Sequence, residues 1–403
     1  MITSFPLLLL PRRVAYVDDQ GIYLDALRSS LTRSGAGAST AISRAFIDSP
    51  ETALTTIRQE VNYWHAVEGL LAEARNAREE RGEAKLYVER YFRDWRRFRL
   101  TSVLFIDYAM PGMNGVQLLE QLQSCPSRRV LLTGQADEQV AIRAFNAGQI
   151  QMFIPKNSPN LLQTVRDALD NLHESMCEHL GYLIRSTLCE WQLDLLHNRG
   201  VREALKLKLG ELEWIEYIVV GQPFGMLGLS HGGPLQWLQI ETHETLQGLA
   251  QGLSDTGWDA SDVERVRQGT DISCDELLEQ LEISAEWQGR LIPTDDICQV
   301  PHLVGALCDL PAKVVTAKQY GIENVSTPAE LMRSLIRDVQ MSYSAKGSDP
   351  DGYGDALAIF GQTAEMSRLH REIASATLSD FNVLHEDVRS ALLSALSKSG
   401  GKR

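Results

Sequence analysis

Short apolar runs alternate with helical patterns along the first 175 residues. Amphipathic segments between the runs predict helices at Leu24–Arg33, Gly115–Gln123 and Glu138–Ala147, and a longer helix from about Asn160. Strands that alternate with helices in this way predict a doubly wound, flavodoxin-like α/β fold with five parallel strands in the order 2-1-3-4-5. The runs with the composition of buried strands are Val14–Val17, Ala45–Ile47, Val103–Ile106, Val130–Leu132 and Met152–Ile154.

A long segment, residues 51–100, separates the second and third predicted strands. It predicts two helices joined near Glu80–Gly82, and in the first of them the spacing of Trp64, Leu70 and Leu71 forms one apolar face. We expect an antiparallel helical arm, inserted into the domain formed by residues 1–175. Such an insertion is compatible with the fold because lengthening a surface connection costs little free energy.

The second arm helix combines aromatic and basic residues. Its aromatic residues recur every three or four positions, which is typical of a helix face that packs on a neighbour. Aromatic rings beside arginines could also stack on nucleic-acid strands, and a surface for a partner protein is a third interpretation. The residues are Tyr87, Tyr91, Trp95 and Phe98, with Arg90, Arg93, Arg96, Arg97 and Arg99.

The segment 160–199 continues a helical pattern beyond the last predicted strand. Its apolar positions from Leu162 to Leu183 approximate a heptad repeat. Two interpretations remain open: a signalling helix that forms a homodimer through residues 160–190, or a helix that packs against its own chain.

Residues 200–403 predict a second, α+β domain that is mainly helical. Trp214–Val220, Gly225–Leu229 and Leu235–Ile240 predict three strands that pair, with a turn at Ser230–Gly233, and helical patterns follow to Ser399. Residues 228–232 also match G-x-S-x-G, the turn that presents a serine nucleophile in some hydrolases. That motif requires a helix after the serine, whereas the pattern here predicts a strand, so a hairpin turn is favoured over a hydrolase site at Ser230.

The charge is divided unevenly between the two halves. Residues 1–175 hold 20 basic and 20 acidic side chains, so the net charge of −14 belongs entirely to the remainder. An acidic carboxyl half disfavours binding to nucleic acid, because phosphate groups repel it. The six cysteines form no C-x-x-C pair, and the apolar run Leu7–Leu10 is too short to span a bilayer, so we expect a cytoplasmic protein with reduced thiols.

Several polar residues directly follow the predicted strands. Asp18 and Asp19 follow the first strand, and Asp107 follows the third. Thr133 and Lys156 end the fourth and fifth strands. Because the functional crevice of a doubly wound sheet lies beyond the carboxyl ends of its strands, we expect these side chains to converge.

The sequence around these residues resembles that of the receiver domain of two-component response regulators, over about residues 12–175. The matching stretches are Val17–Gln20, Phe105–Gly115, Leu132–Gly134 and Phe153–Lys156. The sequence departs from the family at Asn157, where a proline usually follows the lysine, and in the long separation of Asp19 from Asp107.

The resemblance implies that Asp107 accepts a phosphoryl group. Asp18, Asp19 and Asp107, together with the backbone carbonyl of Ala109, are then expected to hold Mg²⁺, which prefers hard oxygen ligands. Lys156 and the hydroxyl of Thr133 are expected to contact the phosphoryl oxygens, and Phe153 matches the aromatic switch residue of the family. Catalysis of this kind consists mostly of positioning and charge neutralisation.

The predicted function is a phosphorylation-dependent response regulator. The expected partners are a sensor histidine kinase or phosphotransfer protein and a downstream protein that binds the carboxyl-terminal module. The alternatives are an enzymatic output at Ser230 and a nucleic-acid-binding regulator that uses the basic arm. No output family is recognised, and the only chemistry predicted is phosphoryl transfer and dephosphorylation at the receiver.

Overall fold

The computed structural model describes residues 5–33, 42–134, 138–230, 234–283 and 288–310. The chain divides into two compact units, residues 1–40 with 44–315, and residues 41–43 with 316–403. Nearly all described residues belong to the first unit. The predicted helices between residue 311 and Ser399, and most of the predicted turn at Ser230–Gly233, lie outside the described residues.

A five-stranded parallel sheet forms the amino-terminal part, in the order β3-β2-β4-β5-β6. Read along the chain, this is the predicted order 2-1-3-4-5. The central strand β4 is buried along its whole length because helices cover both faces of the sheet. The strands are β2 (Arg12–Val17), β3 (Ile42–Ile47), β4 (Val103–Asp107), β5 (Arg128–Thr133) and β6 (Met152–Pro155).

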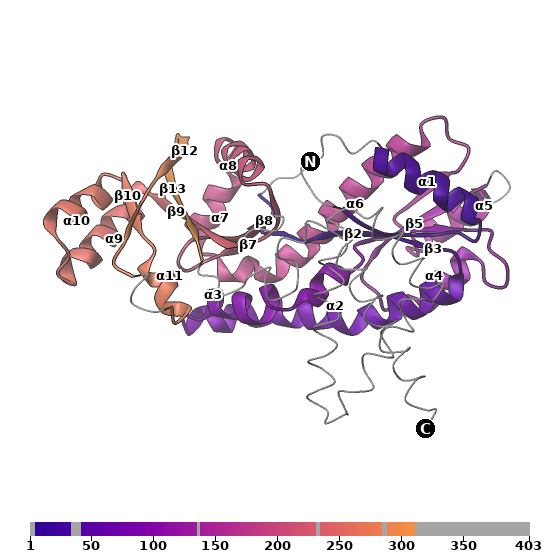
Figure 1. The fold of residues 1–403 in the computed structure, drawn as a ribbon, viewed down its shortest axis with the longest axis horizontal. Coiled ribbons are helices and arrows are strands. Elements are labelled where there is room, and N and C mark those ends of the chain that lie inside the picture. The colour runs from indigo at the N-terminus through magenta and orange to yellow at the C-terminus, as the bar shows by residue number, and fades with distance from the viewer. Residues whose placement is uncertain (1–4, 34–41, 135–137, 231–233, 284–287, 311–403) are drawn as a thin grey trace, which may run out of the picture. The chain divides into compact units, whose positions relative to one another are not determined.

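Helices flank this sheet on both sides. Figure 1 shows α1 and α6 on one side of the sheet and α2 and α4 on the other, and each of these two pairs is in contact. The helix α4 begins with a capping box in which Asn114 and Gln117 hydrogen-bond each other's backbone amides. The helices are α1 (Gly21–Arg33), α2 (Pro50–Glu79), α4 (Gly115–Gln121), α5 (Glu138–Asn146) and α6 (Leu161–Ile184).

The inserted segment contains the first predicted arm helix but not the second. The first is α2, which buries Ile57, Trp64 and Leu71 along one face. The second was wrong as a continuous α-helix: the chain forms the short α3 (Glu83–Leu86), a π-helical turn η1 (Tyr87–Phe92) and a 3-10 turn η2 (Trp95–Arg99). The π-helical turn buries Tyr87, Val88, Tyr91 and Phe92.

The helix α6 packs against its own chain. Its apolar positions, including Val165, Leu172, Met176 and Leu180, are buried, and α6 contacts α1, α2 and β1. The intramolecular interpretation of the heptad-like seam is therefore the one that the structure supports. A 3-10 turn η4 (Arg185–Thr187) and the helices α7 (Glu190–His197) and α8 (Arg199–Leu212) follow.

A second, antiparallel sheet has the strand order β1-β7-β8-β9-β13-β12. The three predicted strands pair as a meander, β7 with β8 and β8 with β9. The apolar run near the amino terminus forms β1, which pairs with β7 at the edge of this sheet. The strands are β1 (Leu8–Leu9), β7 (Trp214–Val220), β8 (Gly225–Ser230), β9 (Leu235–Thr242), β12 (Asp295–Gln299) and β13 (His302–Asp309).

The prediction that mostly helical segments follow Ile240 missed four strands between residues 271 and 309. The helices α9 (His243–Asp255), α10 (Ala260–Arg267) and α11 (Asp275–Gln280) form, but four strands follow or interrupt them. Strand β13 completes its backbone hydrogen bonds with β9, a partner about sixty residues earlier, and such long-range pairing leaves little local signal in the sequence. The two remaining strands, β10 (Asp271–Ser273) and β11 (Leu291–Pro293), form a separate ladder.

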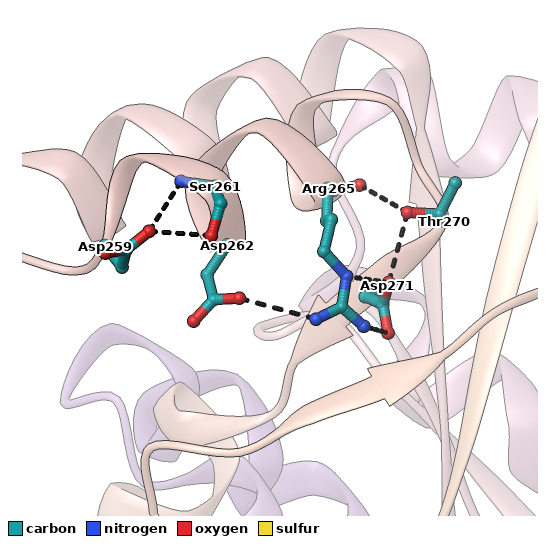
Figure 2. Close-up of polar contacts among 6 residues, drawn as sticks. All are labelled: Asp259, Ser261, Asp262, Arg265, Thr270 and Asp271. Atoms are coloured by element: carbon teal, nitrogen blue, oxygen red, sulfur yellow. Dashed lines mark hydrogen bonds and ion pairs between the residues drawn. The ribbon is translucent and has the colours of Figure 1, made fainter.

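A local polar network attaches α10 to β10 (Figure 2). Asp259 caps the helix by accepting hydrogen bonds from the amide and hydroxyl of Ser261. At the other end, the guanidinium of Arg265 donates two hydrogen bonds to Asp271, of 2.7 and 2.9 Å. Such a paired geometry fixes the start of β10 against the helix.

Buried charged groups join the inserted arm to the second sheet. Arg97 of η2 forms a salt bridge with Glu216 of β7, in which Nη2 lies 2.6 Å from Oε1. Both side chains are at most 2% exposed. Glu83 accepts hydrogen bonds from the amide of Gly221 and the hydroxyl of Tyr87. None of the helices within the described residues is both long and apolar enough to cross a membrane.

Candidate functional site

The carboxyl ends of β2 and β4 bring three aspartates together. Parallel pairing sets Val17 beside Ile106, so the residues that follow each strand lie at the same edge of the sheet. Asp107 is the last residue of β4, and Asp18 and Asp19 lie between β2 and α1. The sequence prediction that these residues converge is confirmed by this placement.

The three aspartates form a compact cluster of oxygen atoms. One carboxylate oxygen from each lies within 4.8 Å of the others. Asp18 and Asp107 are buried, and Asp19 is half-buried. Oδ2 of Asp107 and Oδ1 of Asp19 are buried and have no hydrogen-bond partner among the described residues. Burying such oxygens without a partner costs free energy, and a bound divalent cation would remove that cost. Carboxylate oxygens are also the ligands that such cations prefer.

Lys156 supplies the positive charge beside this cluster. It follows β6 directly, and its Nζ lies 2.6 Å from Oδ2 of Asp18 and 2.8 Å from Oδ1 of Asp107. One ammonium group neutralises only one of the three carboxylates. The remaining negative charge favours a bound cation.

The environment shifts the protonation of both partners. Burial raises the pKa of Asp107 above its ordinary value, although the hydrogen bond from Lys156 opposes the rise. Burial alone would lower the pKa of Lys156, but its hydrogen bonds with Asp107 and Asp18 outweigh that effect and raise it. The side chain of Lys156 therefore stays protonated in this site.

The other predicted site residues lie on the neighbouring strand ends. Thr133 is the last residue of β5 and is buried, and its carbonyl accepts a hydrogen bond from the amide of Lys156 at 2.9 Å. Phe153 is half-buried on β6, in register with Leu131. The amide of Ala109 contacts the Asp107 carboxyl, whereas the predicted role of the Ala109 carbonyl as a metal ligand stays a prediction.

Two further residues shape the site without having been predicted to do so. The Nζ of Lys156 lies 4.6 Å from the centre of the Tyr23 ring, in a cation–π contact from the first turn of α1. Gly115 is required by space, because a Cβ there would lie 2.3 Å from the carbonyl oxygen of Asp107. The glycine that ends the matched motif was a visible signal, whereas nothing in the sequence singled out Tyr23.

The residues behind the two alternative functions are placed differently. Tyr87, Tyr91 and Arg97 of the arm are buried, while Arg90 pairs with Glu73 and Arg96 with Asp94. The buried rings are not available to stack on nucleic-acid bases, as the packing interpretation predicted.

Ser230 occupies a different kind of turn from that of a hydrolase nucleophile. It is the last residue of β8, and the next element is β9, which pairs antiparallel with β8. A strand rather than a helix therefore follows the serine, which is the hairpin context favoured by the sequence pattern.

Comparison with known proteins agrees with the fold. A family model described as the response regulator receiver domain matches residues 88–166, a stretch that includes Asp107, Thr133 and Lys156. The structure of the response regulator LqsR from Legionella pneumophila is similar to this chain, with a TM-score of 0.54 at 21% identity, covering 81% of this chain and 98% of that one. No curated protein sequence matches the chain.

Smaller solved structures are similar to part of this chain. A receiver domain protein from Clostridium thermocellum is 16% identical and covers 41% of this chain and 95% of that one, with a TM-score of 0.26. A CheY-like receiver domain protein from Methanospirillum hungatei is 18% identical and covers 41% of this chain and 98% of that one, with a TM-score of 0.25. The parallel sheet, its acidic strand ends and the matched family model together show that this chain carries a receiver domain of the two-component response regulator family.

Proposed function

We propose that this chain is a phosphorylation-controlled response regulator in which Asp107 takes up a phosphoryl group from a histidine kinase or a phosphotransfer protein. The observation that supports the proposal most directly is the carboxylate cluster at the strand ends, with oxygens within 4.8 Å of one another and Lys156 beside it. Phosphoryl transfer requires little covalent chemistry from the protein beyond a positioned nucleophile and compensating charge.

Asp18, Asp19 and Asp107 fit Mg²⁺, and the carbonyl of Ala109 is proposed as a further ligand. The fit rests on hard carboxylate oxygens, two of which are buried without a hydrogen-bond partner among the described residues. Bound Mg²⁺ would supply charge neutralisation for the oxygens of the transferring group. Calorimetric titration with Mg²⁺ is expected to show binding to the wild type and weaker binding to Asp18→Asn.

The side chains of this chain then have separate tasks. A carboxylate oxygen of Asp107 attacks the phosphorus atom and an acyl phosphate forms. The bond between phosphorus and the imidazole nitrogen of the donor histidine breaks, and that nitrogen leaves with the electron pair. Lys156 and the hydroxyl of Thr133 hydrogen-bond the new phosphoryl oxygens, so Lys156 exchanges part of its contact with Asp18 for contact with the phosphate. The resulting movement of the β5 and β6 ends, with Phe153 on β6, is the proposed switch.

The second sheet and its helices are proposed as a module that binds a downstream protein. This part of the chain carries the net negative charge, which disfavours nucleic acid as the target. The buried contacts of Arg97 and Glu83 connect the inserted arm of the receiver to that module. They support the proposal that the arm transmits the conformational change. A homodimer through residues 160–190 stays an untested prediction, and the apolar seam on which it was based is already buried in the monomer.

The test is phosphorylation of the purified chain with acetyl phosphate and Mg²⁺, followed by intact mass measurement. One phosphoryl group is expected on the wild type and none on Asp107→Asn. Asp25→Asn is the matched control, because Asp25 is an exposed carboxylate on α1 outside the cluster. Lys156→Ala is expected to accept the group but to transmit the change poorly. Equal labelling of wild type and Asp107→Asn would refute the assignment.

A further inference from the structure

Two cysteines lie where the second sheet packs against β10 and α11, the segments that cover it. Cys308 lies on β13, in register with Trp237 of β9. Cys274 directly follows β10 and precedes the first residue of α11. Cys274 is buried and Cys308 is partly exposed, and neither forms a disulfide in this structure.

The packing of the neighbouring residues places the two thiols together. Ile272 of β10 packs in one apolar cluster with Val304 and Ala306 of β13. Side chains two residues apart on a strand share a face, so Cys308 lies on the same face of β13 as Ala306. Cys274 lies two residues beyond Ile272, and each of the two thiols shifts the pKa of the other. The pair therefore lies where β10 meets the sheet.

The two thiols differ in both exposure and acidity. The hydrogen bond from Cys274 lowers the pKa of Cys308 despite partial burial. The same contact, with burial, raises the pKa of Cys274 well above its ordinary value. A partly exposed thiol with a lowered pKa is a better nucleophile than a buried one, whereas the buried thiol is placed to react second.

We propose that Cys308 and Cys274 are a peroxide-sensitive thiol pair that closes into a disulfide. The thiolate of Cys308 attacks one oxygen of hydrogen peroxide, which breaks the O–O bond, forms a sulfenic acid and releases hydroxide. The sulfur of Cys274 then attacks that sulfenic sulfur and displaces its hydroxyl group, and the two protons lost by the thiols complete two molecules of water. Peroxide is reduced and the two sulfurs are oxidised by one electron each.

The disulfide would connect the end of β13 to the start of α11. The preceding strand β10 is already held to α10 by Arg265 and Asp271 (Figure 2). Beyond α11, Glu282 pairs with Lys85 of the inserted arm at 2.5 Å. Oxidation would therefore fasten the covering layer to the sheet close to the point where the arm contacts it. The oxidised chain is expected to unfold at a higher temperature because the cross-link restricts its unfolded state.

The experiment treats the reduced full-length chain with a small excess of hydrogen peroxide, blocks the remaining thiols and maps the peptides by mass spectrometry. The expected result is a linked peptide pair containing Cys274 and Cys308, two fewer free thiols, and reversal by dithiothreitol. The chain loses the mass of two hydrogen atoms. Cys125 and Cys177 are buried and are expected to stay unmodified under the same conditions.

Cys308→Ser is the test variant and Cys298→Ser the matched control, because Cys298 is also partly exposed on the neighbouring strand β12. The control is expected to form the linked pair as the wild type does, and Cys308→Ser is expected to lose it. A chain in which Cys308 is overoxidised without a link, or in which Cys274 pairs equally with another cysteine, would overturn the proposal. Because the wild-type peptide map decides this alone, a folding defect in a variant leaves the test intact.

Discussion

Replacing Arg97 by methionine should destabilise the protein strongly. Arg97 and Glu216 are at most 2% exposed, and the guanidinium donates three hydrogen bonds to that carboxylate and two to the carbonyls of Phe92 and Asp94. Removing the arginine leaves Glu216 buried without its counter-charge. The expected loss in the free energy of unfolding is about 3–5 kcal/mol, the usual cost of breaking a buried ion pair from one side.

The partner variant distinguishes this cause from simple loss of packing. Replacing both residues, Arg97→Met with Glu216→Leu, removes both charges and should be less destabilising than Arg97→Met alone, because no unpaired charge stays buried. Arg90→Met is the control: Arg90 pairs with Glu73, but both side chains are about half exposed, so the expected loss is at most about 1 kcal/mol.

The assay is urea denaturation followed by tryptophan fluorescence and far-ultraviolet circular dichroism. Both signals should report a lower midpoint for Arg97→Met, with the double variant between it and the wild type. A loss below about 1 kcal/mol in Arg97→Met, or a double variant at least as unstable as Arg97→Met, would refute the reasoning.

Two further predictions concern a buried acid and a crowded glycine. Burial raises the pKa of Glu83 from 4.5 to about 7, so the folded state holds the proton more tightly than the unfolded state. The contribution of Glu83 to stability should therefore be fully present below about pH 4.5 and be lost as pH rises through about 7, by up to about 3 kcal/mol. The difference in pH dependence between wild type and Glu83→Gln measures this contribution. Gly115→Ala should lower both the thermal midpoint and labelling by acetyl phosphate, because its Cβ would lie 2.3 Å from the carbonyl oxygen of Asp107. Gly69→Ala on α2 is the control, with open space around the added carbon and an expected gain of about 0.5–1 kcal/mol; unchanged labelling in Gly115→Ala would contradict the packing argument.

Local patterns in the sequence were sufficient to predict the receiver fold. Each buried parallel strand is a short apolar run, and its end is marked by a polar residue such as Asp107 or Lys156. Because parallel strands share one carboxyl edge, the order of these residues along the chain predicted that they converge. The same reasoning identified the antiparallel meander of β7, β8 and β9, whose strands are neighbours in the sequence.

Contacts between distant segments were decided only by the tertiary structure. Strand β13 pairs with β9, and β1 pairs with β7 across most of the described chain, so neither pairing has a local signal. The α-helical periodicity at Tyr87–Phe92 did not reveal the π-helical turn that forms there, and the partner of Arg97 lies more than one hundred residues away. Periodicity in the sequence reports which residues are buried, whereas the partner against which each residue is buried is set by packing over the whole unit.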